Sequence, residues 1–336
     1  TEPNAARACA DAVAAAIHDA GIETVRLDLP SGEEAKRLEV IGTAASTLAR
    51  AGVERGDLIV AIGGGALTDA AGMLAATYLR GIDWIAMPTT LAGQLDASLG
   101  GKTGVDLPEG KNLLGAFHQP RAVIADLRAL RSLPAREIVA ALGEAVKVAM
   151  LGDERLFALL ESAADRLAIA ESSVHDDGTL AEIVERAGWW KCEVVRGDER
   201  EAAGRISLNL GHTLAHALEQ ATDYAGILHG EAVGYGLRAA LTIGLELGVT
   251  PRPHAERASA LLDRLGLGVA PRHEHAADLL AVAQRDKKVA AGKIRWVLPT
   301  GNGYTVSNDL PASLAESAVA SALAGRAANR TGTQQQ

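Results

Sequence analysis

Three histidines and one glutamate fall in short, glycine-flanked motifs in the second half of the sequence. His212 and His216 lie in GHTLAH at a spacing of i, i+4, and His229 lies in LHGEAV. On a helix, the first two imidazoles project from one face. Glu144, in ALGEAVKV, adds a carboxylate with Lys147 one turn later. One carboxylate with two or three imidazoles is typical of a catalytic, zinc-like divalent ion that keeps coordination positions open.

Basic side chains lie close to these motifs in the sequence. The segment KCEVVRGDEREAAGRISLNLGHT carries Lys191, Arg205 and Asn209, and RDKKVAAGK brings Lys287 and Lys288 near the end. Arginine suits bidentate binding of a carboxylate or phosphate, and lysine suits a point contact. Together these residues favour a negatively charged substrate.

A glycine run follows a strand-like segment in the first half. DLIVAI at 57–62 leads into three glycines and then into a helical stretch, in the pattern GGGxxxD rather than GxGxxG. Such a turn lets the backbone approach phosphates at a helix N-terminus. A second strand-like segment ends before two threonines, which we expect at the same carboxyl edge of the sheet. The candidate pyrophosphate-site residues are Gly63, Gly64, Gly65, Asp69, Thr89 and Thr90.

A glycine-rich stretch at 93–117, GQLDASLGGKTGVDLPEGKNLLGAF, carries further polar candidates. Asp96, Lys102, Lys111 and Asn112 are interspersed among its glycines. Flexible backbone that carries lysines suits oxyanion binding. We expect a loop here that contacts an anionic ligand.

The elements that must position these residues change character along the chain. Up to about residue 130, helical and strand-like segments alternate, as in a parallel sheet. A turn at Ser31-Gly32 opens a further helix. The predicted helix covers 5–20, and the predicted strands cover 23–30, 57–62, 82–88 and 122–126.

From Pro134 onward the pattern is helical. Long stretches rich in Ala and Leu cover 135–170, 175–195, 211–223, 229–248, 252–266 and 275–285, with a hairpin-like piece at 293–307. We therefore expect an α/β domain at 1–133 and a helical domain at 134–328. The tail, 329–336, is predicted to be disordered.

The amino-acid composition argues against several classes of protein. The 336 residues suggest two domains, and 48% hydrophobic with 22% charged residues is ordinary globular composition. A net charge of −9 and few aromatic residues argue against nucleic-acid binding. Cys9 and Cys192 cannot form a disulfide framework, and no signal or membrane-spanning segment is apparent. We expect a cytoplasmic protein with no membrane partner.

Taken with these residues, the sequence resembles the 3-dehydroquinate synthase family of sugar phosphate cyclases. The motifs agree in order from about residue 30 to 300: PSGEEAK, GGGALTDAAGMLAATYLRG, PTTLAGQLDASLGGKTGVD, GKNLLGAFHQP, LPAREIVAALGEAVK, DEREAAGRISLNLGHTLAHALE, LHGEAV and DKK. The resemblance implies a Rossmann-like NAD-binding domain followed by an α-helical, metal-binding domain. It also implies a homodimer.

The resemblance implies an enzyme that uses NAD and Zn²⁺ or Co²⁺. Its reaction would convert 3-deoxy-D-arabino-heptulosonate 7-phosphate to 3-dehydroquinate and phosphate, in the shikimate pathway of aromatic amino acid biosynthesis. The sequence of steps is transient oxidation by NAD, phosphate elimination, re-reduction and intramolecular aldol closure. The substrate's own phosphate would help to remove the proton.

The resemblance also assigns roles to residues. The metal ligands would be Glu144, His212 and His229, with His216 as an additional active-site histidine. Residues shared between nicotinamide and substrate would be Asp96, Lys102, Lys111 and Asn112, with Glu33 and Lys36 on the adenosine side. Substrate contacts would be Arg80, Lys147, Lys191, Arg205 and Asn209, together with either Lys287 or Lys288.

Two departures from the family pattern stand out. The family begins with a strand-rich segment that supplies a ribose-binding acid, whereas this sequence starts at Thr1, so we expect a truncated chain or modified NAD binding. Around Glu144, the segment GEAVK replaces residues that are bulkier elsewhere in the family, so the surroundings of this ligand are expected to differ.

Several other functions are compatible with parts of the pattern. Amino-dehydroquinate synthase is the nearest, followed by 2-epi-5-epi-valiolone synthase and 2-deoxy-scyllo-inosose synthase, against which GGKTGVD and GKNLLGAF argue. A metal-dependent alcohol dehydrogenase of the glycerol dehydrogenase type would not need so many phosphate-binding Lys and Arg residues. A catalytically inactive binding protein is disfavoured by the intact carboxylate and imidazoles.

Overall fold

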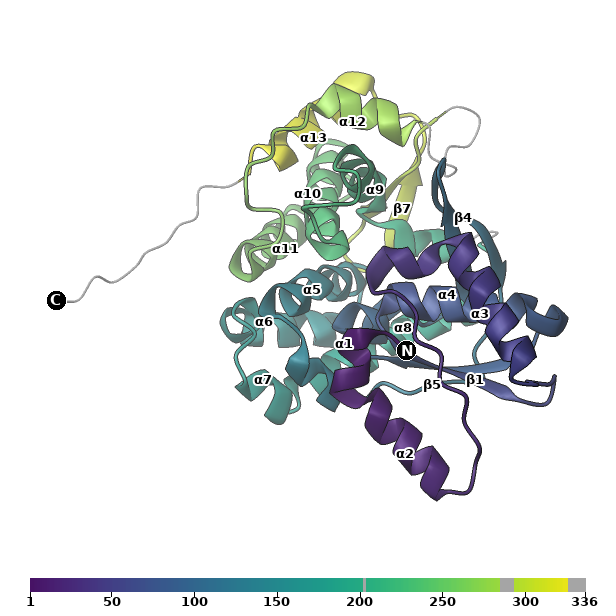
Figure 1. Ribbon diagram of the computed structural model, residues 1–336. Coiled ribbons are helices and arrows are strands. Elements are labelled where there is room, and N and C mark those ends of the chain that lie inside the picture. Colours follow the sequence, from purple (N-terminus) through teal and green to yellow (C-terminus); the bar gives the residue numbers. More distant parts are fainter. Residues whose placement is uncertain (202–203, 285–292, 326–336) are drawn as a thin grey trace. The chain divides into compact units, whose positions relative to one another are not determined.

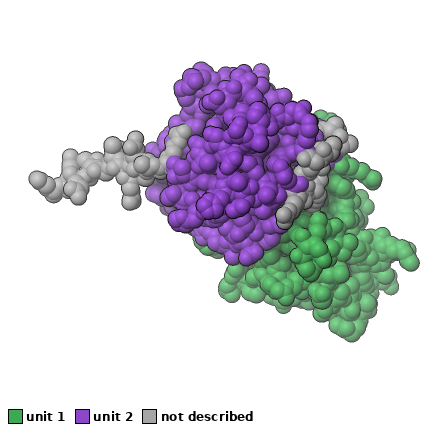
Figure 2. Space-filling model, turned by 90° about the horizontal axis from the view of Figure 1, so that it is seen from above, with its two compact units in different colours: residues 1–134, 180–200 green, residues 135–179, 201–336 purple. Residues whose placement is uncertain are grey.

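The computed structural model describes residues 1–201, 204–284 and 293–325. The chain divides into two compact units, which Figure 2 shows in different colours. The first unit comprises Thr1–Pro134 and Leu180–Arg200, and the second comprises Ala135–Thr179 and Glu201–Gln336.

A parallel sheet forms the centre of the first unit (Figure 1). Its strands are β1 (Leu58–Gly63), β2 (Asp83–Pro88) and β5 (Ala122–Val123), in the order β1-β2-β5. Gly63 is in register with Pro88, so the chain leaves both strands at the same edge. The strands predicted at 57–62 and 82–88 are confirmed, and the one predicted at 122–126 is only two residues long.

Small residues let helix α4 (Gly65–Thr77) pack closely in this unit. Eight of its residues are buried, mostly Ala, Gly and Leu. A Cβ at Gly72 would lie 2.4 Å from the Thr103 side chain, so glycine is needed there. The other helices are α1 (Pro3–Ala5), α2 (Asp11–Asp19), α3 (Leu38–Arg50) and most of α8 (Thr179–Gly197), with the short turns η1 (Ala6–Ala10), η2 (Gly32–Lys36), η3 (Tyr78–Arg80), η4 (Gly93–Ala97) and η5 (Leu127–Ser132).

Two predictions for this unit were wrong. Residues 23–30 form no strand. The backbones of Leu27 and Leu29 bond to Thr1, which is not part of a strand either. The stretch 93–117 is not a flexible loop throughout. It contains an antiparallel hairpin, β3 (Lys102–Leu107) with β4 (Gly110–Phe117), because its Val, Thr, Leu and Phe residues pair across a tight turn.

The second unit is mainly helical, as predicted. Its helices are α5 (Ala135–Met150), α6 (Glu154–Ala168), α7 (Ser173–Asp176), α9 (His212–Ala221), α10 (His229–Glu246), α11 (Arg252–Leu265), α12 (Ala276–Ala283) and α13 (Ala312–Leu323), with the 3₁₀ turn η6 (Gly204–Asn209). The predicted hairpin is present as β6 (Trp296–Pro299) and β7 (Tyr304–Ser307). Helix α10 is buried along most of its length and is the central helix of this unit.

The compact units differ from the predicted division of the chain in one respect. Residues 180–200, most of α8, lie with the first unit although they follow Pro134 in the sequence. The boundary at 133/134 stays a prediction of domain limits. Within the described part of the chain, no helix is both long enough and apolar enough to cross a membrane. The tail predicted to be disordered, 329–336, lies outside the described residues.

Candidate metal centre and active-site residues

Three helices of the second unit bring one carboxylate and two imidazoles together. Glu144 lies in the middle of α5, His212 is the first residue of α9, and His229 is the first residue of α10. Glu144 Oε1 lies 3.3 Å from His212 Nε2 and 3.2 Å from His229 Nε2. One ligand atom from each of the three residues lies within 4.8 Å of the others. A single divalent ion fits among such donors.

Glycines set the distances between these helices. A Cβ at Gly143 would lie 2.5 Å from the carbonyl oxygen of Gly230, and one at Gly230 would lie 1.7 Å from the carbonyl oxygen of Ala140. Helices α5 and α10 therefore touch through their backbones, directly beside Glu144 and His229. Glycine at 143 and 230 lets the two backbones meet at this point.

A second close contact places the start of α9. Gly211 has φ +81, the left-handed conformation that glycine favours, and it immediately precedes His212. A Cβ at Gly236 on α10 would lie 1.7 Å from the carbonyl oxygen of Gly211. The first turn of α9 can approach α10 this closely only because both residues are glycine.

The charges around Glu144 keep it ionised. Burial alone raises the pKa of this carboxyl, but Lys147 and then His212 outweigh burial, so the Glu144 pKa is well below its usual range. Lys147 forms an ion pair with Glu144 Oε2 and is 1% exposed, against 4% for Glu144. A buried carboxylate is thus held negative and ready to bind a cation.

The two imidazoles differ in environment. Burial lowers the pKa of His212 below its ordinary value, so this ring is neutral with a lone pair available. Burial also opposes charge on His229, but its hydrogen bonds to Glu144 and Glu219 outweigh this and raise its pKa. A proton on that ring would have to leave before His229 could bind a metal.

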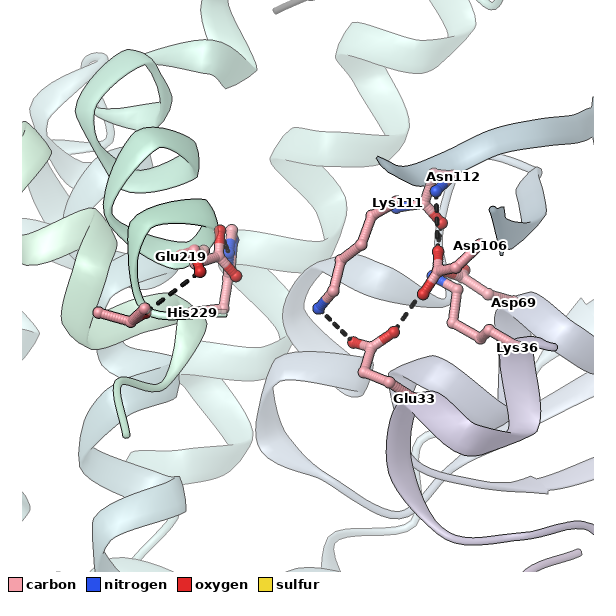
Figure 3. A network of polar contacts seen from close by, with 9 residues as sticks. Glu33, Lys36, Asp69, Asp106, Lys111, Asn112, Glu219 and His229 are labelled. Carbon is pink, nitrogen blue, oxygen red and sulfur yellow. Dashed lines mark hydrogen bonds and ion pairs between the residues drawn. The ribbon is translucent and has the colours of Figure 1, made fainter. Parts of the chain in front are cut away.

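Each imidazole is also held at its other nitrogen. His212 Nδ1 lies 3.1 Å from the Leu210 carbonyl oxygen, and His229 Nδ1 lies 3.2 Å from Glu219 Oε2. Figure 3 shows the contact between Glu219 and His229. Both rings therefore point Nε2 at Glu144. His216 is close but outside the ligand group, with its ring centroid 5.4 Å from that of His212 and 6.4 Å from that of His229.

The other sequence candidates of this unit are Arg205, Asn209, Lys287 and Lys288. Arg205 and Asn209 lie on η6, just before α9, and Arg205 is 1% exposed with Glu201 3.9 Å away. Lys287 and Lys288 lie outside the described residues.

In the first unit, the glycine run joins β1 to α4 at the sheet edge. Gly63 ends the strand, Gly64 caps the helix and Gly65 begins it. The N–H of Thr89 donates to the Gly63 carbonyl oxygen (2.9 Å), which places the end of β2 beside the turn. The Gly64 N–H donates to a carboxylate oxygen of Glu2 (2.9 Å). This turn therefore presents a backbone N–H group to an anionic oxygen.

A buried lysine links the helix after this turn to the hairpin. Lys36 Nζ lies 2.8 Å from Asp69 Oδ2 and 2.5 Å from Asn112 Oδ1 (Figure 3). Burial opposes the charge on Lys36, but Asp69 and then Glu33 outweigh it and raise the Lys36 pKa. For Asp69, burial prevails over Lys36 and raises the carboxyl pKa. Glu33 joins the same network through Lys111, 2.8 Å away.

Asp106 is a member of this network that the sequence analysis did not single out. It accepts the backbone N–H of Asn112 (2.8 Å), which has φ +53 and so adopts a left-handed conformation unusual for a non-glycine residue. The Asp106 and Glu33 carboxyl groups are hydrogen-bonded to each other in Figure 3, which requires a shared proton. Burial raises the pKa of Asp106. Burial also acts on Glu33, but Lys36 and Lys111 outweigh it and lower the Glu33 pKa.

A second ion pair in this unit joins two predicted residues. Lys191 on α8 lies 3.0 Å from Asp96 Oδ2 and donates to the Asp96 backbone oxygen. Lys102 begins β3 and is exposed, and Arg80 is exposed at φ +66 in the turn after α4.

Comparison with known proteins matches most of the chain to one family. The family described as "3-dehydroquinate synthase N-terminal" matches residues 26–140, and "3-dehydroquinate synthase C-terminal" matches residues 141–289. The chain belongs to the 3-dehydroquinate synthase family. A 3-dehydroquinate synthase of Symbiobacterium thermophilum is 42% identical over 308 residues, which cover 91% of this chain and 84% of that protein.

Solved structures of related cyclases share the fold of this family member. The 2-epi-5-epi-valiolone synthase of Streptomyces hygroscopicus, solved with NAD⁺ and Zn²⁺, has a TM-score of 0.85 at 26% identity and covers 96% of this chain and 89% of its own. A 2-deoxy-scyllo-inosose synthase, solved with carbaglucose-6-phosphate, NAD⁺ and Co²⁺, has a TM-score of 0.81 at 26% identity, with 91% and 86% covered. The predicted family and two-part fold class are confirmed.

Two residues of this family member were missed although the sequence carried a signal for each. Glu219 lies seven residues after His212 and three after His216, so the helical period places all three on one face of α9. Asp106 ends the GGKTGVD motif that carries Lys102. Attention to acids at helical spacing from the histidines would have found the first.

Proposed function

We propose that this chain is a 3-dehydroquinate synthase, a carbon–oxygen lyase that converts 3-deoxy-D-arabino-heptulosonate 7-phosphate to 3-dehydroquinate and phosphate. The observation that carries the proposal is the centre formed by Glu144, His212 and His229 in a chain that is 42% identical to a curated 3-dehydroquinate synthase over 91% of its length. The resemblance of the motifs around these residues agrees with it.

The donor set supports a bound Zn²⁺ or Co²⁺. A carboxylate held ionised and two imidazoles with Nε2 turned inward are ligands that both ions accept. Such an ion, when bound, supplies positive charge that acidifies substrate hydroxyls and polarises a ketone. Glu144, His212 and His229 would hold it, and Lys147 would keep Glu144 ionised.

The glycine run supports binding of NAD. Gly64 has an N–H that already donates to an anionic oxygen, that of Glu2, and it lies at the N-terminus of α4, where the helix dipole favours phosphate. NAD, when bound, supplies a hydride acceptor that is regenerated within the cycle. Gly63, Gly64 and Gly65 would hold its pyrophosphate.

Other residues of the first unit would orient the rest of the cofactor. We propose this role for Thr89 and Thr90 at the end of β2 and for the network around Lys36, which is fixed on several sides by carboxylates. The remaining members of the proposed cofactor-binding set are Glu33, Asp69, Asp96, Lys102 and Lys111.

Buried cations support an anionic substrate. Lys147 and Arg205 are each 1% exposed in a chain with a net charge of −9, so two positive charges are held inside the second unit. They would orient the carboxylate or phosphate of the substrate by charge-assisted hydrogen bonds. The same role is proposed for Arg80, Lys191, Asn112, Asn209, His216 and either Lys287 or Lys288.

The percentages of sequence identity argue against the valiolone and inosose synthase functions for this chain. The valiolone and inosose synthases are each 26% identical to this chain, against 42% for the dehydroquinate synthase. Amino-dehydroquinate synthase is the second candidate. A homodimer and a cytoplasmic location stay predictions.

Product analysis distinguishes the proposed reaction from a simple dehydrogenation. Incubation with the heptulosonate phosphate, NAD and Zn²⁺ is expected to release one phosphate per carbocycle with no lasting rise in NADH, because the hydride is returned. Phosphate is measured colorimetrically, NADH by absorbance and the product by mass spectrometry. A sustained NADH increase equal to the substrate consumed, without phosphate, would establish a dehydrogenase. Turnover of only the amino analogue would establish the second candidate.

Gly64→Val tests the cofactor site. The backbone at Gly64 is extended (φ −72, ψ 179), so valine can adopt it, but a Cβ there would lie 3.2 Å from Thr90 Cγ2 and would cover the N–H group. We expect NAD affinity, measured by calorimetry, to fall by more than about 10-fold, a loss of at least ~1.4 kcal/mol. Gly56→Val, at a position with open space in the same unit, is the control. Equal NAD affinities in the two variants would place the cofactor elsewhere.

A further inference from the structure

The two imidazoles of the metal centre are fixed in unequal ways. His212 has a side chain that is 10% exposed, and its Nδ1 faces a backbone carbonyl oxygen, that of Leu210. His229 has a side chain that is 41% exposed, and its Nδ1 faces the carboxylate of Glu219 at 3.2 Å. Packing therefore restrains the first ring and leaves much of the second in contact with solvent.

We propose that Glu219 is a positioning residue for the metal centre, which holds the Nδ1–H of His229 so that Nε2 faces the cation. A carboxylate can only accept from an N–H group, so this contact places the hydrogen on Nδ1 and leaves the lone pair on Nε2 when the ring is neutral. Nε2 is the atom that lies 3.2 Å from Glu144 Oε1. The inference rests on metal binding at Glu144, His212 and His229, as proposed above.

The helix that carries His212 also delivers Glu219. Glu219 follows His212 by two turns of α9, so both side chains project from the same face of the helix. Its side chain is 13% exposed, although a carboxylate at a helix surface would ordinarily extend into water. Its carboxylate therefore lies inward, where it couples the end of α9 to the first residue of α10.

Geometry argues against Glu219 as a fourth ligand. Its carboxylate contacts His229 at Nδ1, while the donor group of Glu144, His212 and His229 gathers at Nε2 on the other side of the ring. A carboxylate in this place acts through the imidazole: it fixes the tautomer and the ring orientation and makes Nε2 a stronger donor.

Metal affinity tests the proposal without reference to turnover. The purified full chain is stripped with a chelator and titrated with Zn²⁺ in competition with a chromophoric chelator. We expect Glu219→Ala to weaken Zn²⁺ binding by about 10–100-fold, the range found when such partners of a ligating histidine are removed. Glu219→Gln keeps an oxygen that can accept from Nδ1 and is expected to lose less than Glu219→Ala.

Glu246→Gln is the matched control, because it removes the same charge from an exposed position at the end of α10. It is expected to bind Zn²⁺ as the unmodified chain does. Affinities within about twofold for Glu219→Ala and Glu246→Gln would overturn the proposal, since even the low end of the expected range is larger. An equal loss in Glu219→Gln and Glu219→Ala would overturn it too, because the charge rather than the hydrogen bond would then act.

The design separates this proposal from the one on which it rests. If the unmodified chain binds neither Zn²⁺ nor Co²⁺, the metal centre itself is wrong and both proposals are overturned. If it binds metal but releases no phosphate from the heptulosonate phosphate, the proposed function alone is wrong, and the comparison of Glu219 variants keeps its meaning. Thermal unfolding of each variant shows whether a loss of affinity reflects the site or the fold.

Discussion

His229→Ala is expected to abolish stoichiometric metal binding. It removes one of three protein ligands whose donor atoms lie within 4.8 Å of one another. Structural zinc sites bind with apparent free energies of about 10–16 kcal/mol, so the loss of a third of the ligands costs at least about 3 kcal/mol, more than ~100-fold in affinity. The variant should fold, because the His229 side chain is 41% exposed and its removal leaves no enclosed cavity. Elemental analysis after gel filtration measures the bound metal.

His216→Ala is the matched control for this result. His216 is the same residue type on α9, and its ring centroid lies 6.4 Å from that of His229, but it is not part of the donor group. We expect it to retain one metal per chain. If His216→Ala loses the metal and His229→Ala keeps it, the i, i+4 histidine pair forms the site and the assignment of His229 is wrong.

The sequence was sufficient to predict most of the architecture. The buried strands at 57–62 and 82–88 and the long helices after Pro134 show strong hydrophobic patterns, which fix the type of element even where the ends shift by a residue or two. The segment 23–30 shows an equally clear alternation, yet it forms no strand. Alternation favours an extended conformation, but a strand also needs a partner to bond to, and no local pattern reveals one.

The assignment of α8 shows a second limit. Its sequence is helical and follows Pro134, so the order along the chain placed it with the helical domain, whereas residues 180–200 lie with the first unit. Which unit a helix joins depends on tertiary contacts, such as that of Gly188 with Leu99, where a Cβ would lie 3.3 Å from the Leu99 side chain. Helical periodicity carries no information about such a partner.

The candidate metal ligands could be named from the sequence, although they lie in three separate motifs. Residue type and spacing pointed to a carboxylate with two or three imidazoles, and the resemblance to the family chose His212 and His229 over His216 as the ligands. Asp106 and Glu219 act through a neighbour instead, one on the backbone of Asn112 and the other on the ring of His229. Helical spacing could have drawn attention to Glu219, but only the distance in the folded chain shows which partner such a residue contacts.

Gly230→Ala is expected to damage the metal centre from outside its ligand set. A Cβ on Gly230 would lie 1.7 Å from the Ala140 carbonyl oxygen, whereas real Cβ contacts are essentially never under 3.0 Å. Helices α5 and α10 would have to separate by more than an ångström, directly beside Glu144 and His229. Ligand distances in metal sites tolerate about 0.2 Å, so we expect Zn²⁺ affinity to fall by at least ~100-fold. Overpacking should also lower the free energy of unfolding by about 1–3 kcal/mol or more.

Alanine is expected to raise, rather than lower, the free energy of unfolding where it replaces a helical glycine that faces open space. Gly42 lies within α3 and nothing lies within 4 Å of a Cβ placed there, so Gly42→Ala should raise stability by about 0.5–1 kcal/mol and leave Zn²⁺ affinity unchanged. Chelator competition and denaturant unfolding measure both quantities. In Gly143→Ala the new Cβ would lie 2.5 Å from the Gly230 carbonyl oxygen, so its Zn²⁺ affinity and stability should lie between those of Gly230→Ala and Gly42→Ala. If Gly230→Ala binds Zn²⁺ as tightly as Gly42→Ala does, then the backbone contact between α5 and α10 does not set the distance from Glu144 to His229.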